Sequence, residues 1–418
     1  MSSGHDASPA CVARRGHASD RDIGALFRRH GDAFRRAHAL GAMQRRALRD
    51  ISVCRTGALG GHRDVCPNCG CEREVYNSCC NRACPKCQAL PQARWVGKRM
   101  ERALPISHFH VVFTLPAELR ELVRVHEDLL LNLLVSSAAR TLLQLASDPK
   151  RLGGLLGITA VVHTWARNLI FHPHVHCIVT GGGLDADNGW VDSYEKFLLP
   201  VDVLRAKFRG KFLDGLARLF DEGKLTVSPH IPERVACLLE PTAFARLKDT
   251  LCAKDWVVYT KAPFKKPDAL FRYLGMYTHR VAISNHRILH VDDHSVVFRT
   301  RDNKVCHLAP LEFIRRFLLH VLPRGFVKIR HFGLYAAGNV NSKLATARSA
   351  IERQCAPTET TPAPVPDAPA DETLDWRALF RKLTGIDLGI CPHCGCALIS
   401  MPLSQSTHPS RAPPAPPS

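Results

Sequence analysis

The sequence predicts an α+β protein of two or three domains, on three observations. The chain has 418 residues, 45% of them hydrophobic, which is enough for a substantial core and too long for one typical domain. Short β-type runs alternate with amphipathic helical stretches. Seventeen cysteines gather mainly in 54–87 and 391–396. Without a secretory signal, such clusters indicate reduced thiols and metal sites in the cytoplasm rather than a disulfide framework.

The charge balance favours a polyanionic partner. Lys and Arg number 57 against 38 Asp and Glu, a formal charge of +19, so nucleic acid is the first partner to consider. The most apolar stretch, 129–146, is interrupted by polar residues, including Asn132, Ser136, Ser137, Arg140 and Gln144. It is too polar for a bilayer span, and we expect no membrane association.

The first predicted domain, 14–100, begins with a basic helical arm. Residues 14–49 contain ten arginines and three aspartates, and apolar residues recur there at helical spacing. Two interpretations stay open: a DNA-binding arm or a solvated surface helix. The candidate DNA contacts in the arm are Arg28, Arg29, Arg35 and Arg36.

A cysteine-rich module follows within this domain. Cys66-Pro-Asn-Cys69 and Cys84-Pro-Lys-Cys87 are two CxxC knuckles separated by 14 residues, close to the spacing of a four-thiolate structural zinc site. Further candidate ligands are Cys54, His62 and Cys79, and a half-site at Cys391 and Cys394. That half-site could close locally, fold back onto another ligand, or bind nothing.

The second predicted domain, 105–345, opens with a strand at 109–115 and a helix at 119–146. A hairpin over 158–165 and 169–180 follows, then a helix around 204–219 and a strand at 255–260. A helix at 269–280, strands at 287–291 and 295–299 and a helix at 311–321 complete it. A Pro-rich linker at 356–371, a small CPxC module at 372–401 and a disordered tail at 402–418 end the chain.

Histidines alternate along the second strand of the hairpin, in His172-Pro-His174-Val-His176. Side chains alternate along a strand, so His174 and His176 share one face and can hold one divalent ion. If Asn168-Leu169 is a two-residue turn, residues whose numbers sum to 337 lie opposite one another, which makes His163 a third ligand. His108 and His110 also alternate, and one of them can face the same site.

Two tyrosines of the six in the chain, Tyr273 and Tyr277, stand one helical turn apart beside Arg272 and Arg280. A pair of aromatic core residues would be the default interpretation. A phenol with a pKa of about 10 is a weak nucleophile, so a chemical role needs a polarised electrophile, such as a phosphate bound to a metal ion.

The chain resembles the transposases of insertion-sequence family ninety-one. The resemblance covers roughly 25–345 and the CPxCG knuckle. It lies in the motifs Phe109–Pro116, Phe171–Val179, Tyr273–Asn285, Phe317–Pro323 and Arg330–Gly333. The order of strand, histidine pair and tyrosine helix is also that of rolling-circle HUH nucleases. The sequence departs from the family at Ala83, where relatives carry histidine, and at Cys80 and Met276, where they carry a basic residue.

The resemblance implies a DNA transposase with an N-terminal zinc-binding domain and an antiparallel-sheet HUH endonuclease core of split βαβ, RRM-like plan. His174 and His176 would bind Mg2+ or Mn2+, and Tyr273 and Tyr277 would be the nucleophiles. The enzyme would nick and rejoin single-stranded element ends through a 5′-phosphotyrosine. A plasmid-type replication initiator and a non-catalytic zinc-dependent DNA-binding protein are the alternatives.

Overall fold

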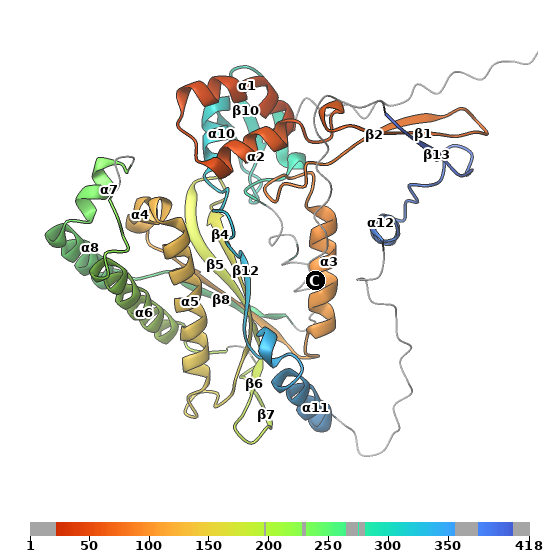
Figure 1. Cartoon of the computed structure of the whole chain (residues 1–418). Helices are drawn as coiled ribbons and strands as arrows, with labels where there is room; N and C mark the ends of the chain where they lie inside the picture. Colours follow the sequence, from red (N-terminus) through yellow and green to blue (C-terminus); the bar gives the residue numbers. More distant parts are fainter. Residues whose placement is uncertain are drawn as a thin grey trace, which may run out of the picture. The chain divides into compact units, whose positions relative to one another are not determined.

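The computed structural model describes residues 22–195, 198–227, 231–264, Gly275, 281–355 and 375–403. These residues form two compact units (Figure 1). Unit 1 comprises the described parts of 22–91, 281–321 and 375–403, and unit 2 those of 92–278 and 322–355. The units are therefore discontinuous in sequence, whereas the sequence predicts consecutive domains.

Unit 1 has a helical core built from two distant segments. Helices α1 (Ile23–Ala37) and α2 (Ala42–Ser52) pack with α10 (Pro310–Leu318). Phe27 of α1 meets Phe317 edge-on at 5.4 Å between ring centroids. The apolar stripe of the predicted arm is thus mostly core, because Ile23, Leu26, Phe27 and Phe34 are each at most 2% exposed.

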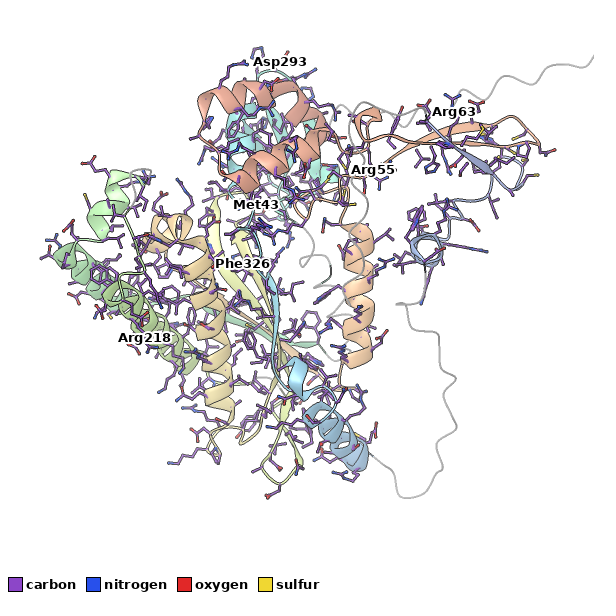
Figure 2. All side chains as sticks on the ribbon, in the orientation of Figure 1. Met43, Arg55, Arg63, Arg218, Asp293 and Phe326 are labelled. Carbon is purple, nitrogen blue, oxygen red and sulfur yellow. The ribbon has the colours of Figure 1, made fainter. Side chains whose placement is uncertain are left out.

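Two small antiparallel sheets complete unit 1. Strands β9 (Ile288–Val291), β10 (Val296–Arg299) and β11 (Val305–Leu308) form one, and Phe298 of β10 packs on Phe313 of α10. The other has the order β13-β1-β2, from β1 (Gly61–Val65), β2 (Glu72–Tyr76) and β13 (Ile399–Pro402). Arg63 marks β1 in Figure 2. Helix α12 (Trp376–Thr384) precedes β13.

Unit 2 is built on a five-stranded antiparallel sheet of order β12-β4-β5-β3-β8. Its strands are β3 (His108–Thr114), β4 (Gly157–Trp165), β5 (Phe171–Thr180), β8 (Val258–Phe264) and β12 (Ile329–Gly333). The predicted strands at 109–115, 158–165 and 169–180 are therefore confirmed within two residues. A two-stranded ribbon, β6 (Gly182–Leu184) and β7 (Trp190–Asp192), follows β5.

Helices cover one face of this sheet. Helix α5 (Glu127–Ala146) packs on β4 and β5, and α6 (Val201–Asp221) packs on β8 and α5. The buried face presents Phe113, whose ring lies 4.9 Å from that of Phe208 in α6. The exposed side chains of α6, among them Arg218, lie on its opposite side (Figure 2). The other helices of this side are α4 (Arg120–Val125), α7 (Glu233–Leu238) and α8 (Pro241–Ala253).

Helix α5 is the one described helix that is long and apolar enough to cross a membrane by length and composition alone. Its apolar residues face the sheet and α6, and eleven of its side chains are buried. Burial of this kind accounts for the apolar composition, as in the core helix of any α+β domain.

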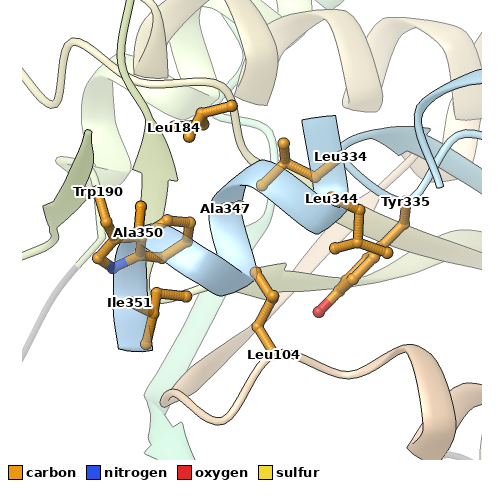
Figure 3. Close-up of a cluster of buried hydrophobic side chains, with 9 residues drawn as sticks. All are labelled: Leu104, Leu184, Trp190, Leu334, Tyr335, Leu344, Ala347, Ala350 and Ile351. Atoms are coloured by element: carbon orange, nitrogen blue, oxygen red, sulfur yellow. The ribbon is translucent and has the colours of Figure 1, made fainter. Parts of the chain in front are cut away.

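A second cluster closes the end of unit 2 near β6 and β7. Helix α11 (Lys343–Cys355) contributes Leu344, Ala347, Ala350 and Ile351, which pack against Leu104, Trp190 and Tyr335 (Figure 3). Tyr335 donates a hydrogen bond from its hydroxyl to Nε2 of His108 over 2.9 Å. Both side chains are buried, so this bond fixes the start of β3 against the segment after β12.

The face of the sheet opposite α5 carries helix α3 (Ala89–Arg102) near one end. Trp95, Val96 and Met100 of α3 pack against Ile178 of β5. Even-numbered residues of β5 share this face, so His172, His174 and His176 lie on the same side of the sheet as α3.

Candidate functional site

Three imidazoles meet on the α3 face of the sheet. His163 of β4 lies directly opposite His174 of β5, and His176 is two residues further along β5. Their ring centroids are 4.3 to 5.4 Å apart, and one ring nitrogen of each lies within 4.8 Å of the others. The predicted shared face and the predicted pairing of His163 with His174 are both confirmed.

The turn that produces this pairing differs from the predicted one. Ala166 N–H donates to Ile170 O over 2.9 Å, which closes a three-residue loop with Leu169 at a φ of 64°. A bulge between His163 and Trp165 then shifts the register by one residue. The longer loop and the bulge shift the strand pairing by one residue in opposite directions. His163 therefore still pairs with His174, as the sum of 337 predicts, although the predicted two-residue turn is wrong.

Neighbouring groups hold two of the three rings in place. His174 Nδ1 lies 2.7 Å from the carbonyl oxygen of His172, and His176 Nδ1 lies 2.7 Å from His110 Nε2. These contacts leave Nε2 as the nitrogen that would coordinate an ion. His163 stacks on Trp165 at 4.4 Å between ring centroids, with Lys328 Nζ 5.0 Å from the same indole.

The surroundings keep the neighbouring histidines neutral. Burial, with smaller contributions from Lys261 and His174, lowers the pKa of His110 to about 4. Burial and the nearby Arg120 guanidinium also lower the pKa of His172. Neutral imidazole is the form that accepts a hydrogen bond from a neighbouring ring or binds a metal ion.

Basic groups lie along the same face. Arg120 Nη2 is 3.3 Å from His172 Nδ1, and Arg99 Nη1 of α3 is 2.9 Å from His331 Nε2 of β12. At the sheet edge, Tyr259 of β8 pairs with Val112, which pairs on its other side with His176. Tyr259 is 53% exposed and Lys261 follows it on the same face. Sequence patterns alone do not reveal Tyr259, because its exposure depends on which strand forms the edge.

The predicted nucleophiles Tyr273 and Tyr277, with Arg272 and Arg280, lie outside the described residues. Gly275, midway between the tyrosines in sequence, is described and buried. A Cβ atom added to Gly275 would come 2.5 Å from Cγ2 of Val96 in α3. Gly275 therefore lies close against α3, the helix that packs on the histidine face of the sheet.

The cysteines of unit 1 form two four-thiol groups, which corrects the predicted grouping of Cys66 and Cys69 with Cys84 and Cys87. Cys84 and Cys87 gather with Cys54 and Cys79, and the Sγ distances Cys54–Cys87, Cys54–Cys84 and Cys79–Cys87 are 3.5 to 3.7 Å. Cys66 and Cys69 gather instead with Cys391 and Cys394. The two predicted knuckles therefore belong to different groups, because β13 brings the C-terminal knuckle beside the hairpin β1–β2.

Both groups have the chemistry of zinc ligands. Hydrogen bonds within the first group hold the pKa of Cys87 well below its usual value and raise the pKa values of Cys79 and Cys84. Backbone N–H of Cys396 and the thiol of Cys66 lower the pKa of Cys394 to about 6. His62 belongs to neither group, and its Nε2 lies 3.5 Å from Asp64 Oδ1. The group around Cys84 is complete with four thiols although Ala83 replaces the family's histidine.

The candidate DNA contacts of α1 are at the surface. Arg28, Arg29, Arg35 and Arg36 are all exposed. Arg28 Nη1 donates to Ser52 O over 2.8 Å, Arg29 lies 3.6 Å from Asp293, and Arg35 pairs with Asp32. Three of the four thus already have intrachain partners, which exposed guanidinium groups can exchange for phosphate at little cost.

Comparison with known proteins identifies two family models along the chain. Residues 26–115 match a family described as "Transposase zinc-binding domain", and residues 157–343 match one described as "Putative transposase". The chain is 41% identical over 382 residues to "Putative transposase y4qJ" of Sinorhizobium fredii, covering 89% of this chain and 92% of that protein. It is 28% identical over 369 residues to "Transposase for insertion sequence element IS801" of Pseudomonas savastanoi pv. phaseolicola, covering 84% of each. No solved structure matches.

Proposed function

Because the chain belongs to the transposases of insertion-sequence family ninety-one, we propose that unit 2 is its HUH-type nuclease domain. As a transposase the chain is an enzyme that cleaves and joins DNA strands. The proposed reaction is nicking and rejoining of single-stranded DNA at the ends of an element. One observation carries this proposal: three imidazoles on one face of an antiparallel sheet, with ring nitrogens within 4.8 Å of one another.

The three imidazoles fit a divalent ion. His163, His174 and His176 would each present one nitrogen, and the contacts from His172 and His110 support the rings. Such support is typical of metal-ligating histidines. Of Mg2+ and Mn2+, the nitrogen set favours Mn2+, since Mg2+ takes oxygen ligands and keeps most of its water. When bound, the ion would withdraw charge from the scissile phosphate.

Tyr273 and Tyr277 are the proposed nucleophiles. The phenolic oxygen of one would form a bond to the scissile phosphorus and lose its proton to solvent, while the bond from phosphorus to the 3′ oxygen breaks. The departing oxygen takes up a proton, which leaves a 3′-hydroxyl and a 5′-phosphotyrosine. The second tyrosine would serve the later strand transfer. Because the phosphodiester energy is kept in the tyrosyl ester, joining needs no ATP.

The position of Gly275 supports this assignment. It lies against Val96 of α3, and α3 packs on the face that carries the histidines. In the sequence, one residue separates Gly275 from Tyr273 and one separates it from Tyr277.

Groups on the same face would bind the strand beside the scissile phosphate. Arg120, next to His172, would neutralise phosphate charge. Tyr259 is two strands from His176, about 10 Å between Cα atoms at the usual strand spacing of ~4.8 Å. This distance suits a base stacked on the exposed phenol one or two nucleotides from the reaction centre, with Lys261 beside the backbone.

The remaining basic residues would bind DNA mainly through phosphates. They include the exposed arginines of α1 and, in the undescribed segment, Arg272 and Arg280. We assign a structural Zn2+ of the zinc-binding domain to Cys54, Cys79, Cys84 and Cys87, which satisfy a tetrahedral site completely. The proposed location is the cytoplasm, where thiols stay reduced and DNA is accessible.

The test incubates the purified protein with labelled single-stranded oligonucleotides from candidate element ends, with Mn2+, with Mg2+, or with a chelator. A covalent adduct should appear on a denaturing gel only with metal. Tyr273→Phe and Tyr277→Phe should each impair transposition, and the double variant should give no adduct. Tyr194→Phe, which changes a tyrosine that is 65% exposed elsewhere in unit 2, is the matched control.

His174→Ala separates chemistry from binding. It should lose metal-dependent cleavage and retain DNA affinity, since the basic residues are untouched. An adduct that persists in the double phenylalanine variant would show that the nucleophile is another residue. Full cleavage by His174→Ala would remove the metal site from the mechanism.

A further inference from the structure

Two segments of unit 1 carry the same six-residue pattern, Cys-Pro-X-Cys-Gly-Cys, at 66–71 and 391–396. In each, the first cysteine N–H donates to the carbonyl of the last cysteine, and the glycine N–H donates back to the first cysteine, over 2.8 to 3.0 Å. Gly70 and Gly395 adopt φ values of 70° and 74°, a region that favours glycine. The segments are therefore two copies of one turn. Cys84-Pro-Lys-Cys87 is followed by Gln-Ala and does not share the pattern.

The two turns present their first two thiols to each other. Cys66 and Cys394 are 3.4 Å apart at Sγ, and Cys69 and Cys391 are 3.6 Å apart. Four sulfurs bound to one Zn2+ at ~2.3 Å lie about 3.8 Å from one another in a tetrahedron. The observed spacing is close to that value. The third cysteine of each turn, Cys71 or Cys396, does not belong to the four-thiol group.

Backbone and side-chain contacts bring the same two segments together around the thiols. Strand β13 pairs antiparallel with β1 from His62 to Val65. The buried carboxylate of Asp64 on β1 accepts from Ser400 Oγ over 2.5 Å and from Arg73 Nη2 over 2.6 Å. Arg73 also donates to Leu388 O over 3.1 Å. The four thiols thus lie at one end of a three-stranded sheet made from both ends of the chain.

We propose that Cys66, Cys69, Cys391 and Cys394 bind a second Zn2+, and that this ion holds residues 375–403 on the hairpin β1–β2. Two of the ligands come from inside the zinc-binding family match at 26–115, and two come from beyond it. The zinc-binding module is therefore completed by the C-terminal knuckle. This inference does not depend on the proposed nuclease reaction, because it concerns only unit 1.

Zinc content tests the site. The full-length protein, purified without added metal and analysed by mass spectrometry under native conditions and by elemental analysis, should contain two Zn2+ per chain. Cys391→Ser with Cys394→Ser should contain one, and Cys54→Ser should lose the other. Cys71→Ser with Cys396→Ser is the matched control, because it alters the third cysteine of both turns and should keep two ions.

Two further variants distinguish the loss of a zinc ligand from misfolding of the protein. Cys394→His retains a zinc-binding side chain at an exposed position and should keep both ions, whereas Cys394→Ala should lose one. One Zn2+ in the wild-type protein, or two in Cys391→Ser with Cys394→Ser, would overturn the proposal. So would a disulfide between the two turns in freshly purified protein, detected by mass spectrometry without reduction.

The holding role needs a separate measurement. A protease site inserted in the Pro-rich segment 356–371 allows the folded full-length chain to be cut after purification. The C-terminal fragment should stay bound through gel filtration and dissociate when a zinc chelator is added. In Cys391→Ser with Cys394→Ser it should separate after cleavage alone. Retention in chelator would show that β-pairing and the Asp64 contacts suffice and that the ion does not hold the segment.

Discussion

Replacement of His110 by phenylalanine tests how the proposed metal site is supported. His110 Nε2 lies 2.7 Å from His176 Nδ1, and the two rings are nearly parallel at 5.0 Å between centroids. Phenylalanine keeps an aromatic ring in the same buried position and removes the acceptor. His176 would then lose the contact that fixes its tautomer and its orientation.

The expected magnitude follows from burial. Loss of such a supporting contact typically lowers metal affinity about 10-fold to 100-fold. His110 is 2% exposed, so water cannot readily take its place. We therefore expect the upper half of the range, about 30-fold to 100-fold, which corresponds to ~2 to 2.7 kcal/mol at ~1.36 kcal/mol per tenfold.

Titration of the protein with Mn2+, followed by electron paramagnetic resonance of the unbound ion, measures this affinity. The rate of adduct formation against Mn2+ concentration gives a second readout and should recover at saturating metal. His108→Gln is the matched control, because His108 occupies the same face of β3 but bonds to Tyr335 and Ile106. Unchanged Mn2+ affinity in His110→Phe, or equal loss in His108→Gln, would refute the reasoning.

Two other predictions concern the same unit. Tyr259→Ala should lower affinity for single-stranded DNA by ~1 to 3 kcal/mol, the usual contribution of one stacked base, while Tyr259→Phe and the control Tyr194→Ala bind normally. Fluorescence anisotropy in chelator measures this without cleavage, and equal binding by Tyr259→Ala would exclude the stacking role. Burial lowers the pKa of His108 from 6.5 to about 4, so the fold favours its neutral form and this stabilisation is complete above pH 6.5. This contribution to the free energy of unfolding should be lost as pH falls from 6.5 to 4, by up to about 3 kcal/mol. Urea denaturation should therefore show a weaker pH dependence of stability for His108→Gln than for the wild-type protein. Identical pH profiles of the two proteins would contradict this prediction.

The histidine site was largely predictable because it depends on local patterns. Alternation along β5 places His174 and His176 on one face, and a hairpin necessarily sets some residue of β4 opposite His174. The pairing with His163 agrees with the structure even though the turn differs, because Arg167 joins Asn168 and Leu169 in the loop and the bulge before Trp165 removes the resulting shift. The support from His110 depends on the pairing of β3 with β5. This pairing brings together His110 and His176, which are 66 residues apart in the sequence.

The sequence leaves open that the half-site at Cys391 and Cys394 folds back onto another ligand, as it does, but proximity in sequence is a poor guide to which ligands it meets. The spacing of the knuckles groups Cys66 and Cys69 with Cys84 and Cys87, 14 residues away, whereas their partners in the structure lie more than 320 residues away. One sequence feature could have indicated the correct grouping: the Gly-Cys that follows Cys69 and Cys394 but not Cys87. The packing of α10 on α1 has no comparable local feature, since an apolar helix face does not specify which helix it meets.

The discontinuous build of unit 1 has a consequence for biosynthesis. Cys69 leaves the ribosome 322 residues before Cys391, which at ~5 to 20 residues per second is roughly 16 to 64 s of translation. During that interval the nascent hairpin has an unpaired strand edge and two thiols without their metal partners. The sheet of unit 2, whose last strand ends at Gly333, can form earlier. A message cut short before the last knuckle would thus yield a polypeptide with an intact histidine centre but an unfinished N-terminal module.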